Sequence, residues 1–130
     1  MKESVWKEMI AHCKKELPYE ACGLLSGKNG VAETIWKMKN VERSPVSFAM
    51  DTTQLQQTLK QIQQNKEALT GIYHSHPTGI AYPSSRDIEY AHYPEAAYII
   101  ISLANQKPVV KGFRIINRKV IPLMIQLLHD

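Results

Sequence analysis

The feature that most constrains this chain of 130 residues is a pair of histidines that closes an apolar segment. His74 and His76 are separated by one residue, and the segment before them begins at Leu69. Side chains two residues apart point to the same face of a β-strand, whereas on a helix they point in different directions. A strand over residues 69–76 therefore presents both imidazoles on one face, where they can bind a single metal ion.

A carboxylate further along the chain can complete this set of ligands. Asp87 follows a turn-rich loop over residues 77–83, and a short helix predicted near 84–93 would carry it in its first turn. The chain would then fold back over the end of the strand. Catalytic zinc commonly takes three protein ligands from histidine and carboxylate side chains and keeps a fourth position open. His74, His76 and Asp87 thus form a candidate site for zinc.

Ser84 allows two interpretations. It precedes Asp87 by three residues, and a Ser-x-x-Asp pattern before a short helix is typical of an N-cap. A hydroxyl beside an open zinc position can also donate a hydrogen bond to the oxyanion that forms when a carbonyl is attacked. Taken alone, the pattern favours the capping role.

A hydrolytic zinc site also needs a base that removes a proton from the attacking water. Four glutamates upstream of the histidines are candidates, and their spacing does not choose among them: Glu16, Glu20, Glu33 and Glu42. A cysteine nucleophile is a separate alternative, in which His74 would activate Cys22. Small buried cysteines are more often structural, so we expect Cys13 and Cys22 to be packing residues.

Two separated blocks of residues resemble the JAMM family of metalloproteases, also called JAB or MPN-plus. The family signature is an upstream Glu, then His-x-His, seven residues, Ser, two residues and Asp. The chain matches it with Glu20, His74, His76, Ser84 and Asp87. The segment 18–27, PYEACGLLSG, is also similar to the block that carries the glutamate in small bacterial members.

The resemblance implies a role for each of these residues. Zn²⁺ would be held by His74, His76 and Asp87, while Glu20 would be the general acid/base and Ser84 would stabilise the tetrahedral intermediate. The small bacterial members are similar to peptidases that trim the Gly-Gly C-terminal tail of ubiquitin-like sulfur-carrier proteins, some of them in cysteine biosynthesis. We therefore expect a zinc-dependent metallopeptidase that hydrolyses a peptide or isopeptide bond at such a tail, with the carrier protein as its partner.

Two other functions stay open at this point. A non-catalytic MPN scaffold would bind proteins, although such modules normally lack the metal ligands. The His-x-His-Pro-x-Gly run, residues 74–79, also resembles the RadC group linked to DNA repair, but the 18–27 block favours the peptidase branch. The formal net charge of +4 is spread along the chain without a dense basic tract, so nucleic-acid binding has little support.

The apolar pattern predicts an α+β fold in one domain, residues 1–130. Helices are expected near residues 3–17, 52–66 and 84–93. Strands are expected at 22–28, 31–38, 45–50, 69–76, 97–103, 109–116 and 119–124, with a tight turn at Asn29-Gly30 and a doubly buried strand at Ile99-Ile100-Ile101. The resemblance implies that the mixed sheet is curved and partly barrel-like, with two main helices packed against it and the short helix at the metal site.

The sequence also predicts where the protein works. No apolar run approaches the roughly 20 residues of a membrane-spanning helix, and the N-terminus lacks the apolar core of a signal peptide. Two cysteines without metal-binding spacing fit a reducing compartment. We therefore expect a cytoplasmic protein without a membrane partner. The remaining histidines, His12, His92 and His129, are expected to be exposed and without a catalytic role.

Overall fold

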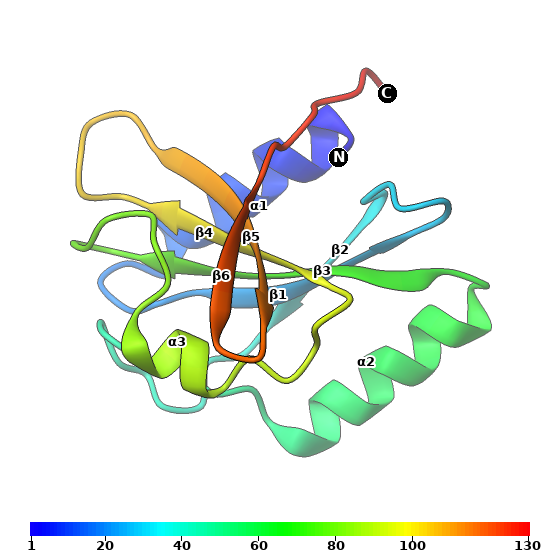
Figure 1. Ribbon diagram of the computed structural model, residues 1–130, viewed down its shortest axis with the longest axis horizontal. Coiled ribbons are helices and arrows are strands. Elements are labelled where there is room, and N and C mark those ends of the chain that lie inside the picture. Colours follow the sequence, from blue (N-terminus) through cyan, green and yellow to red (C-terminus); the bar gives the residue numbers. More distant parts are fainter.

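The computed structural model describes all 130 residues as one six-stranded sheet with helices on both faces (Figure 1). In chain order the elements are α1 (Glu3–Lys15), β1 (Cys22–Gly27), β2 (Thr34–Met38), α2 (Thr52–Gln64), β3 (Ala68–His76), α3 (Ser85–Glu89), β4 (Ala97–Ser102), β5 (Val109–Ile116) and β6 (Lys119–Leu123). The expected α+β class is confirmed. None of the three helices combines the length and the apolar character that crossing a bilayer requires.

The sheet is mixed, with the strand order β2-β1-β3-β4-β5-β6. β3 and β4 run parallel, and every other neighbouring pair is antiparallel. The strands twist across the width of the sheet (Figure 1), but the edge strands β2 and β6 do not pair with each other. The sheet therefore stays open rather than closing into a barrel.

Helix α1 covers one face of the sheet. Its buried side chains Val5, Met9 and Cys13 recur every four residues and form an apolar stripe along the helix. The stripe packs in one cluster with Tyr73 of β3 and Ile99 of β4. Most of the stability of a helix of this length comes from such packing rather than from intrinsic propensity.

Helices α2 and α3 lie on the opposite face (Figure 1). Asp51 caps α2, because its carboxylate accepts a hydrogen bond of 2.9 Å from the backbone N–H of Gln54. The buried Ile62 of α2 packs with Ile72 of β3. β4 is covered on both faces, because Ile99 and Ile101 pack with the α1 stripe while Ile100 packs with Ala81 and Phe113. All three isoleucines are buried as predicted.

The parallel pairing of β3 with β4 determines the path of the next segment. Parallel strands need a long connection, because the chain must return to the other end of the sheet before the second strand begins. Here the connection is residues 77–96, which leave the end of β3 and carry α3 over the face that α2 also covers. The start of α3 therefore comes to lie beside the last residues of β3.

Some predicted elements are wrong or too long. Residues 45–50 do not form a strand, because the Asn40 side chain bonds to the backbone of Ser47 and Ala49 and replaces a strand partner. The third helix ends at Glu89 instead of residue 93, ahead of Pro94. The Asn29-Gly30 turn forms with positive φ at both residues, but β2 begins only at Thr34.

The prediction that His12 is exposed is also wrong. His12 is only 7% exposed, and its Nδ1 lies 2.6 Å from the hydroxyl of Tyr73. Burial lowers the pKa of His12 and raises the pKa of Tyr73, so the neutral ring accepts the hydrogen bond that the hydroxyl donates. His12 follows Met9 by three residues, so the helical stripe already placed it on the buried face.

The close contact between Gly23 and Tyr73 generates a prediction about stability. A methyl group at residue 23 would overlap the Tyr73 ring, which is fully buried and cannot swing away. We expect Gly23→Ala to lower the free energy of unfolding by about 1–3 kcal/mol, as overpacking does, measured by urea titration. Gly79→Ala is the matched control, because its methyl group would meet its nearest neighbour, His76, at 3.7 Å. Equal stability of the two variants would contradict this packing.

Candidate metal centre

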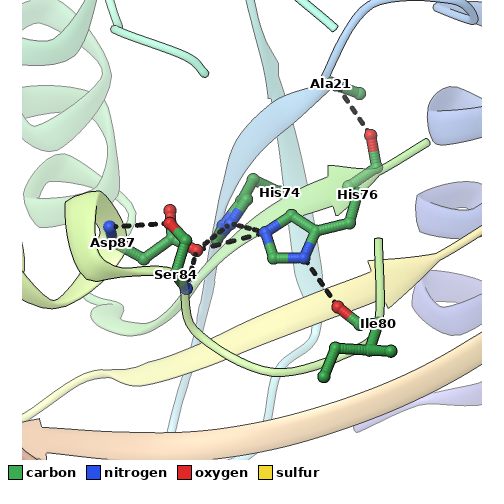
Figure 2. Close-up of polar contacts among 7 residues, drawn as sticks. Ala21, His74, His76, Ile80, Ser84 and Asp87 are labelled. Atoms are coloured by element: carbon green, nitrogen blue, oxygen red, sulfur yellow. Dashed lines mark hydrogen bonds and ion pairs between the residues drawn. The ribbon is translucent and has the colours of Figure 1, made fainter. Parts of the chain in front are cut away.

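The end of β3 and the start of α3 bring His74, His76 and Asp87 together (Figure 2). The Nε2 atoms of the two histidines lie 3.1 Å apart. Asp87 Oδ2 lies 3.0 Å from Nε2 of His74 and 3.1 Å from Nε2 of His76. The three side chains that the sequence singled out therefore converge on one point.

This triangle of atoms has the dimensions of a zinc site. Tetrahedral bonds of about 2.0–2.1 Å place neighbouring ligand atoms about 3.3 Å apart. The separations of 3.0 to 3.1 Å in this protein are close to that value. Two imidazole nitrogens and one carboxylate oxygen are also a donor set that suits Zn²⁺. The residues present thus fit one divalent ion.

A backbone carbonyl orients His76. Its Nδ1 lies 2.7 Å from the carbonyl oxygen of Ile80, as Figure 2 shows. Because a carbonyl can only accept, Nδ1 carries a proton. Burial opposes protonation of the ring, but the bonds to Asp87 and Ile80 raise the pKa of His76. The lone pair that binds a metal ion is therefore on Nε2 once that atom has lost its proton. The Ser102 hydroxyl holds the same loop by donating to the carbonyl of Gly79 at 2.6 Å. The loop therefore selects the tautomer of His76 that can bind a metal.

His74 is oriented mainly by packing. It is 2% exposed, and its ring stacks on Phe48 with the ring centres 4.6 Å apart. Burial lowers the pKa of His74, although Asp87 opposes this shift. The neutral imidazole that results is the form that binds metals.

Asp87 is held by the helix end that carries it. The Ser84 hydroxyl accepts a hydrogen bond of 3.1 Å from the Asp87 N–H, and the Ser84 N–H donates to Asp87 Oδ2 at 2.9 Å. This reciprocal pair is a capping box, so the capping role of Ser84 is confirmed. Burial opposes ionisation of the carboxyl, but bonds from His74, His76 and Ser84 hold the pKa of Asp87 well below its usual range. Asp87 is therefore ionised, as a metal ligand must be.

The capping role of Ser84 leaves its other interpretation open. A hydroxyl that accepts one hydrogen bond keeps its own proton for a second partner. Ser84 is exposed beside the three convergent atoms, so this proton is accessible to a bound molecule. Capping and the stabilisation of an oxyanion are therefore compatible.

Strand pairing places Glu20 beside His76. In the antiparallel ladder of β1 and β3, Cys22 lies opposite His74. Glu20 precedes Cys22 by two residues, as His76 follows His74 by two, so its side chain lies on the same face of the sheet as the histidines. A glutamate separated from the histidines by more than fifty residues thus reaches the site through sheet register.

The environment of Glu20 suits proton transfer. Its side chain is buried, and Oε1 has no hydrogen-bond partner in the protein. Burial raises the pKa of Glu20 to about 7, with a further contribution from Asp87 and an opposing one from His76. A carboxyl group with a pKa near neutrality can both accept and release a proton during a reaction.

The other candidate bases have different surroundings. Glu16 lies 3.5 Å from His12, Glu42 pairs with Arg86 at 2.7 Å, and Glu33 lies at the far end of β1, where its N–H bonds to Ser26. Cys13 and Cys22 are both buried and free, and burial raises the pKa of each thiol to about 12. Neither is a thiolate at neutral pH, which supports the structural role expected for them.

Ser75 is a positioning residue that sequence reasoning missed. It is fully buried, and its hydroxyl accepts a hydrogen bond of 2.8 Å from the N–H of Ala21. Its own N–H donates to the carbonyl of Ala21 at 3.0 Å. The neighbouring Glu20 is held in the same way, because its N–H donates to Ser44 and its carbonyl accepts from the Asn40 side chain. The only signal in the sequence was a small polar residue between two ligands.

Two cavities of different chemistry are lined by different residues of the site. One, of about 560 Å³, is lined by His74 and Asp87 together with the aromatic rings of Phe48 and Tyr98. The other, of about 750 Å³, is lined by Glu20 and by none of the three convergent ligands.

Three convergent metal ligands beside a buried, proton-accepting carboxyl are what a metal-dependent hydrolase needs. Comparison with known proteins identifies the family. Residues 2–116 match the family described as prokaryotic homologs of the JAB domain. The chain belongs to this family, and the resemblance that the sequence indicated is confirmed.

Relatives and solved structures agree with this assignment. The CysO-cysteine peptidase of Mycobacterium tuberculosis is 33% identical over 112 residues, which are 84% of this chain and 77% of the relative. A probable TtuB-protein conjugate cleaving protease of Thermus thermophilus is 38% identical over 95 residues, or 72% of this chain and 63% of the relative. The solution structure of a protein from Desulfitobacterium hafniense is 36% identical with a TM-score of 0.89, covering 99% of this chain and 92% of that one. The two curated relatives are a peptidase and a protease, so the peptidase class that the sequence predicted is confirmed.

The bonds between Ser75 and Ala21 generate a prediction about the site. Ser75→Ala removes the only side-chain acceptor of the Ala21 N–H, and we expect a loss of about 1–3 kcal/mol in the free energy of unfolding, because a buried donor is left unsatisfied. The measurement is urea unfolding followed by circular dichroism. Ser85→Ala, which removes the hydroxyl of an exposed serine, is the control and should be nearly neutral. An unchanged midpoint for Ser75→Ala would contradict the positioning role.

Proposed function

We propose that this protein is a zinc-dependent metallopeptidase that hydrolyses the peptide or isopeptide bond after the Gly-Gly tail of a ubiquitin-like or sulfur-carrier protein. The observation that carries the proposal is the convergence of His74, His76 and Asp87 within 3.1 Å of one another, with Glu20 near enough for His76 and Asp87 to shift its pKa. The names of the relatives, which specify CysO-cysteine and TtuB conjugates, support this substrate class and a place in cysteine biosynthesis.

In this proposal His74, His76 and Asp87 hold the metal ion. The ion, when bound, supplies a Lewis acid that polarises the scissile carbonyl and lowers the pKa of water. The carbonyl of Ile80 keeps the lone pair of His76 directed at the ion position, and the capping box keeps Asp87 ionised. The protein therefore contributes three ligand side chains that are already in place.

Glu20 moves the proton. Its carboxylate accepts a proton from the attacking water while the water oxygen bonds to the carbonyl carbon, and the same group then gives the proton to the leaving nitrogen as the C–N bond breaks. The unpartnered Oε1 is free to take this role. The Ser84 hydroxyl, with its own proton unused by the capping box, donates to the oxyanion. Glu20 therefore supplies both proton transfers, and Ser84 supplies the hydrogen bond to the oxyanion.

Burial of the site supports a glycine tail as substrate. His74 is 2% and His76 is 8% exposed, so the reacting atoms are recessed. A segment without side chains can approach them closely, whereas bulky residues beside the scissile bond would be held away. An extended tail can also gain backbone hydrogen bonds by pairing with exposed strand groups. These are the properties of a Gly-Gly tail.

The alternative functions have weaker support. A non-catalytic scaffold does not need three convergent metal ligands, and a DNA-repair role is not accompanied by a dense basic tract. We also place the protein in the cytoplasm, which two buried free thiols support.

Metal binding provides a first test. We expect the purified protein to bind zinc stoichiometrically, measured by plasma mass spectrometry after dialysis, and a chelator to abolish cleavage. His74→Ala should lower zinc affinity by at least about 100-fold, because even outer partners of a ligand contribute about 10–100-fold. His129→Ala, which removes an exposed histidine, should bind zinc like the parent. Full zinc binding by His74→Ala would remove this residue from the ligand set.

Turnover provides the second test. A ubiquitin-like carrier that ends in Gly-Gly followed by a short extension is incubated with the zinc-loaded protein, and its intact mass is measured. We expect loss of the extension, and we expect Glu20→Gln to lower the rate by at least about 100-fold, because general acid–base catalysis contributes about 10²–10⁴, while zinc content stays unchanged. Glu8→Gln, which changes an exposed glutamate of α1, is the matched control and should keep most of the activity.

The result can go against the proposal in two ways. Cleavage by Glu20→Gln at the parent rate would refute the proton-transfer role of this residue. Failure of the zinc-loaded parent to cleave any Gly-Gly-tailed carrier would favour the scaffold.

A further inference from the structure

We propose that the cavity lined by Glu20 binds a carboxylate on the segment that leaves after hydrolysis. The inference rests on the proposed function, because it assigns one side of the same site to the leaving group. We call this space the basic cavity, defined by the four cationic side chains that line it: Lys15, Lys37, Lys39 and Arg43.

The cations of the basic cavity come from separate parts of the chain. Lys15 is the last residue of α1, Lys37 belongs to the edge strand β2, and Lys39 and Arg43 follow β2. Their gathering around one space of about 750 Å³ is therefore a product of the fold and not of a basic run in the sequence. Glu20 contributes to the same wall.

These cations are not neutralised by the protein. None of the four forms a salt bridge with a carboxylate, and Arg43 instead lies over the ring of Tyr19, 5.5 Å from its centre. Besides Glu20, Glu16 is the only acid in the wall, so positive side chains outnumber negative ones. Unpaired charges of one sign around a cleft raise the local concentration of ligands of the opposite sign.

The reaction determines which part of the substrate enters the basic cavity. Glu20 gives its proton to the leaving nitrogen, so the first residue of the leaving segment must lie next to Glu20. The chain beyond that nitrogen then continues into the space that Glu20 lines. The second cavity, beside His74 and Asp87, has a different character, because its one arginine, Arg86, already pairs with Glu42 at 2.7 Å.

A carboxylate on the leaving segment has two sources. It is either the free C-terminus of a segment of one or a few residues, or the side chain of an acidic residue near the cleaved bond. Both offer the oxygens that lysine and arginine bind with charge-assisted hydrogen bonds. A leaving segment that is neutral or basic lacks this contact.

Binding of product-like peptides tests the inference without turnover. The probes are the tripeptides Ala-Asp-Glu and Ala-Asn-Gln, each with a free C-terminus, and the amide of Ala-Asn-Gln, titrated into the whole ¹⁵N-labelled protein. We expect saturable shifts of the amides of Lys37, Lys39 and Arg43 with Ala-Asp-Glu and little change with the neutral amide. Ala-Asn-Gln with a free C-terminus separates the two sources, since it binds only if the terminal carboxylate is recognised.

A pair of variants tests whether the basic cavity is responsible. The double variant Lys39→Gln/Arg43→Gln should weaken binding of Ala-Asp-Glu by about ten-fold, the sum expected for two partly exposed charged contacts. Lys111→Gln/Arg114→Gln removes the same charge from exposed positions of β5 and should bind like the parent. Equal weakening by both pairs would mean that only net charge matters and would overturn the inference.

Turnover separates this inference from the proposed function. With carriers that differ only in the residues after Gly-Gly, we expect kcat/KM to be higher for the acidic extension than for the neutral amide, and the advantage to shrink in Lys39→Gln/Arg43→Gln. Equal cleavage of the acidic and neutral extensions would overturn the basic cavity and leave the peptidase intact. Absence of all cleavage, with Ala-Asp-Glu still bound at the basic cavity, would overturn the peptidase and leave carboxylate binding in place.

Discussion

The register between β1 and β3 is the constraint on which the rest of the site depends. Ser75 bonds twice to Ala21, once through its hydroxyl and once through its backbone, and so extends the ladder beyond the end of β1. Two residues before Cys22, which pairs with His74, Glu20 lies on the same face of the sheet as the histidines. A shift of one residue would turn Glu20 to the other face of the sheet, because successive side chains alternate. Backbone pairing thus couples the position of Glu20 to those of His74 and His76.

The parallel pair β3 and β4 provides the second part of the site. Its long connection leaves the sheet where the two histidines stand, and the carbonyl of Ile80 in that connection orients His76. The same connection then starts α3, whose first turn holds Asp87 through the capping box with Ser84. One topological requirement therefore supplies a ligand, the partner that orients another ligand, and the serine that caps the helix carrying Asp87.

The two sides of the site differ in chemistry, and Glu20 gives them a direction. Glu20, the proposed proton carrier, also lines the basic cavity, where four cations without a salt-bridge partner gather. In the second cavity, beside His74 and Asp87, the only arginine is Arg86, and Glu42 neutralises its charge. A substrate would therefore lie with its leaving segment toward the positive side. The direction follows from proton transfer, since the group that receives the proton must adjoin Glu20.

The amino-acid sequence alone was sufficient for the family, the α+β class and the convergent triad of His74, His76 and Asp87, because motif spacing and strand or helix periodicity are local properties. The catalytic roles of Glu20 and Ser84 stay predictions. It did not reveal the buried His12, the loop at 45–50 or the bonds of Ser75 and Ile80, since these depend on which distant backbone groups come into contact. Only the tertiary structure decided the raised pKa of Glu20 and the gathering of the basic cavity, because burial and electrostatic fields arise from neighbours that the chain brings together by folding.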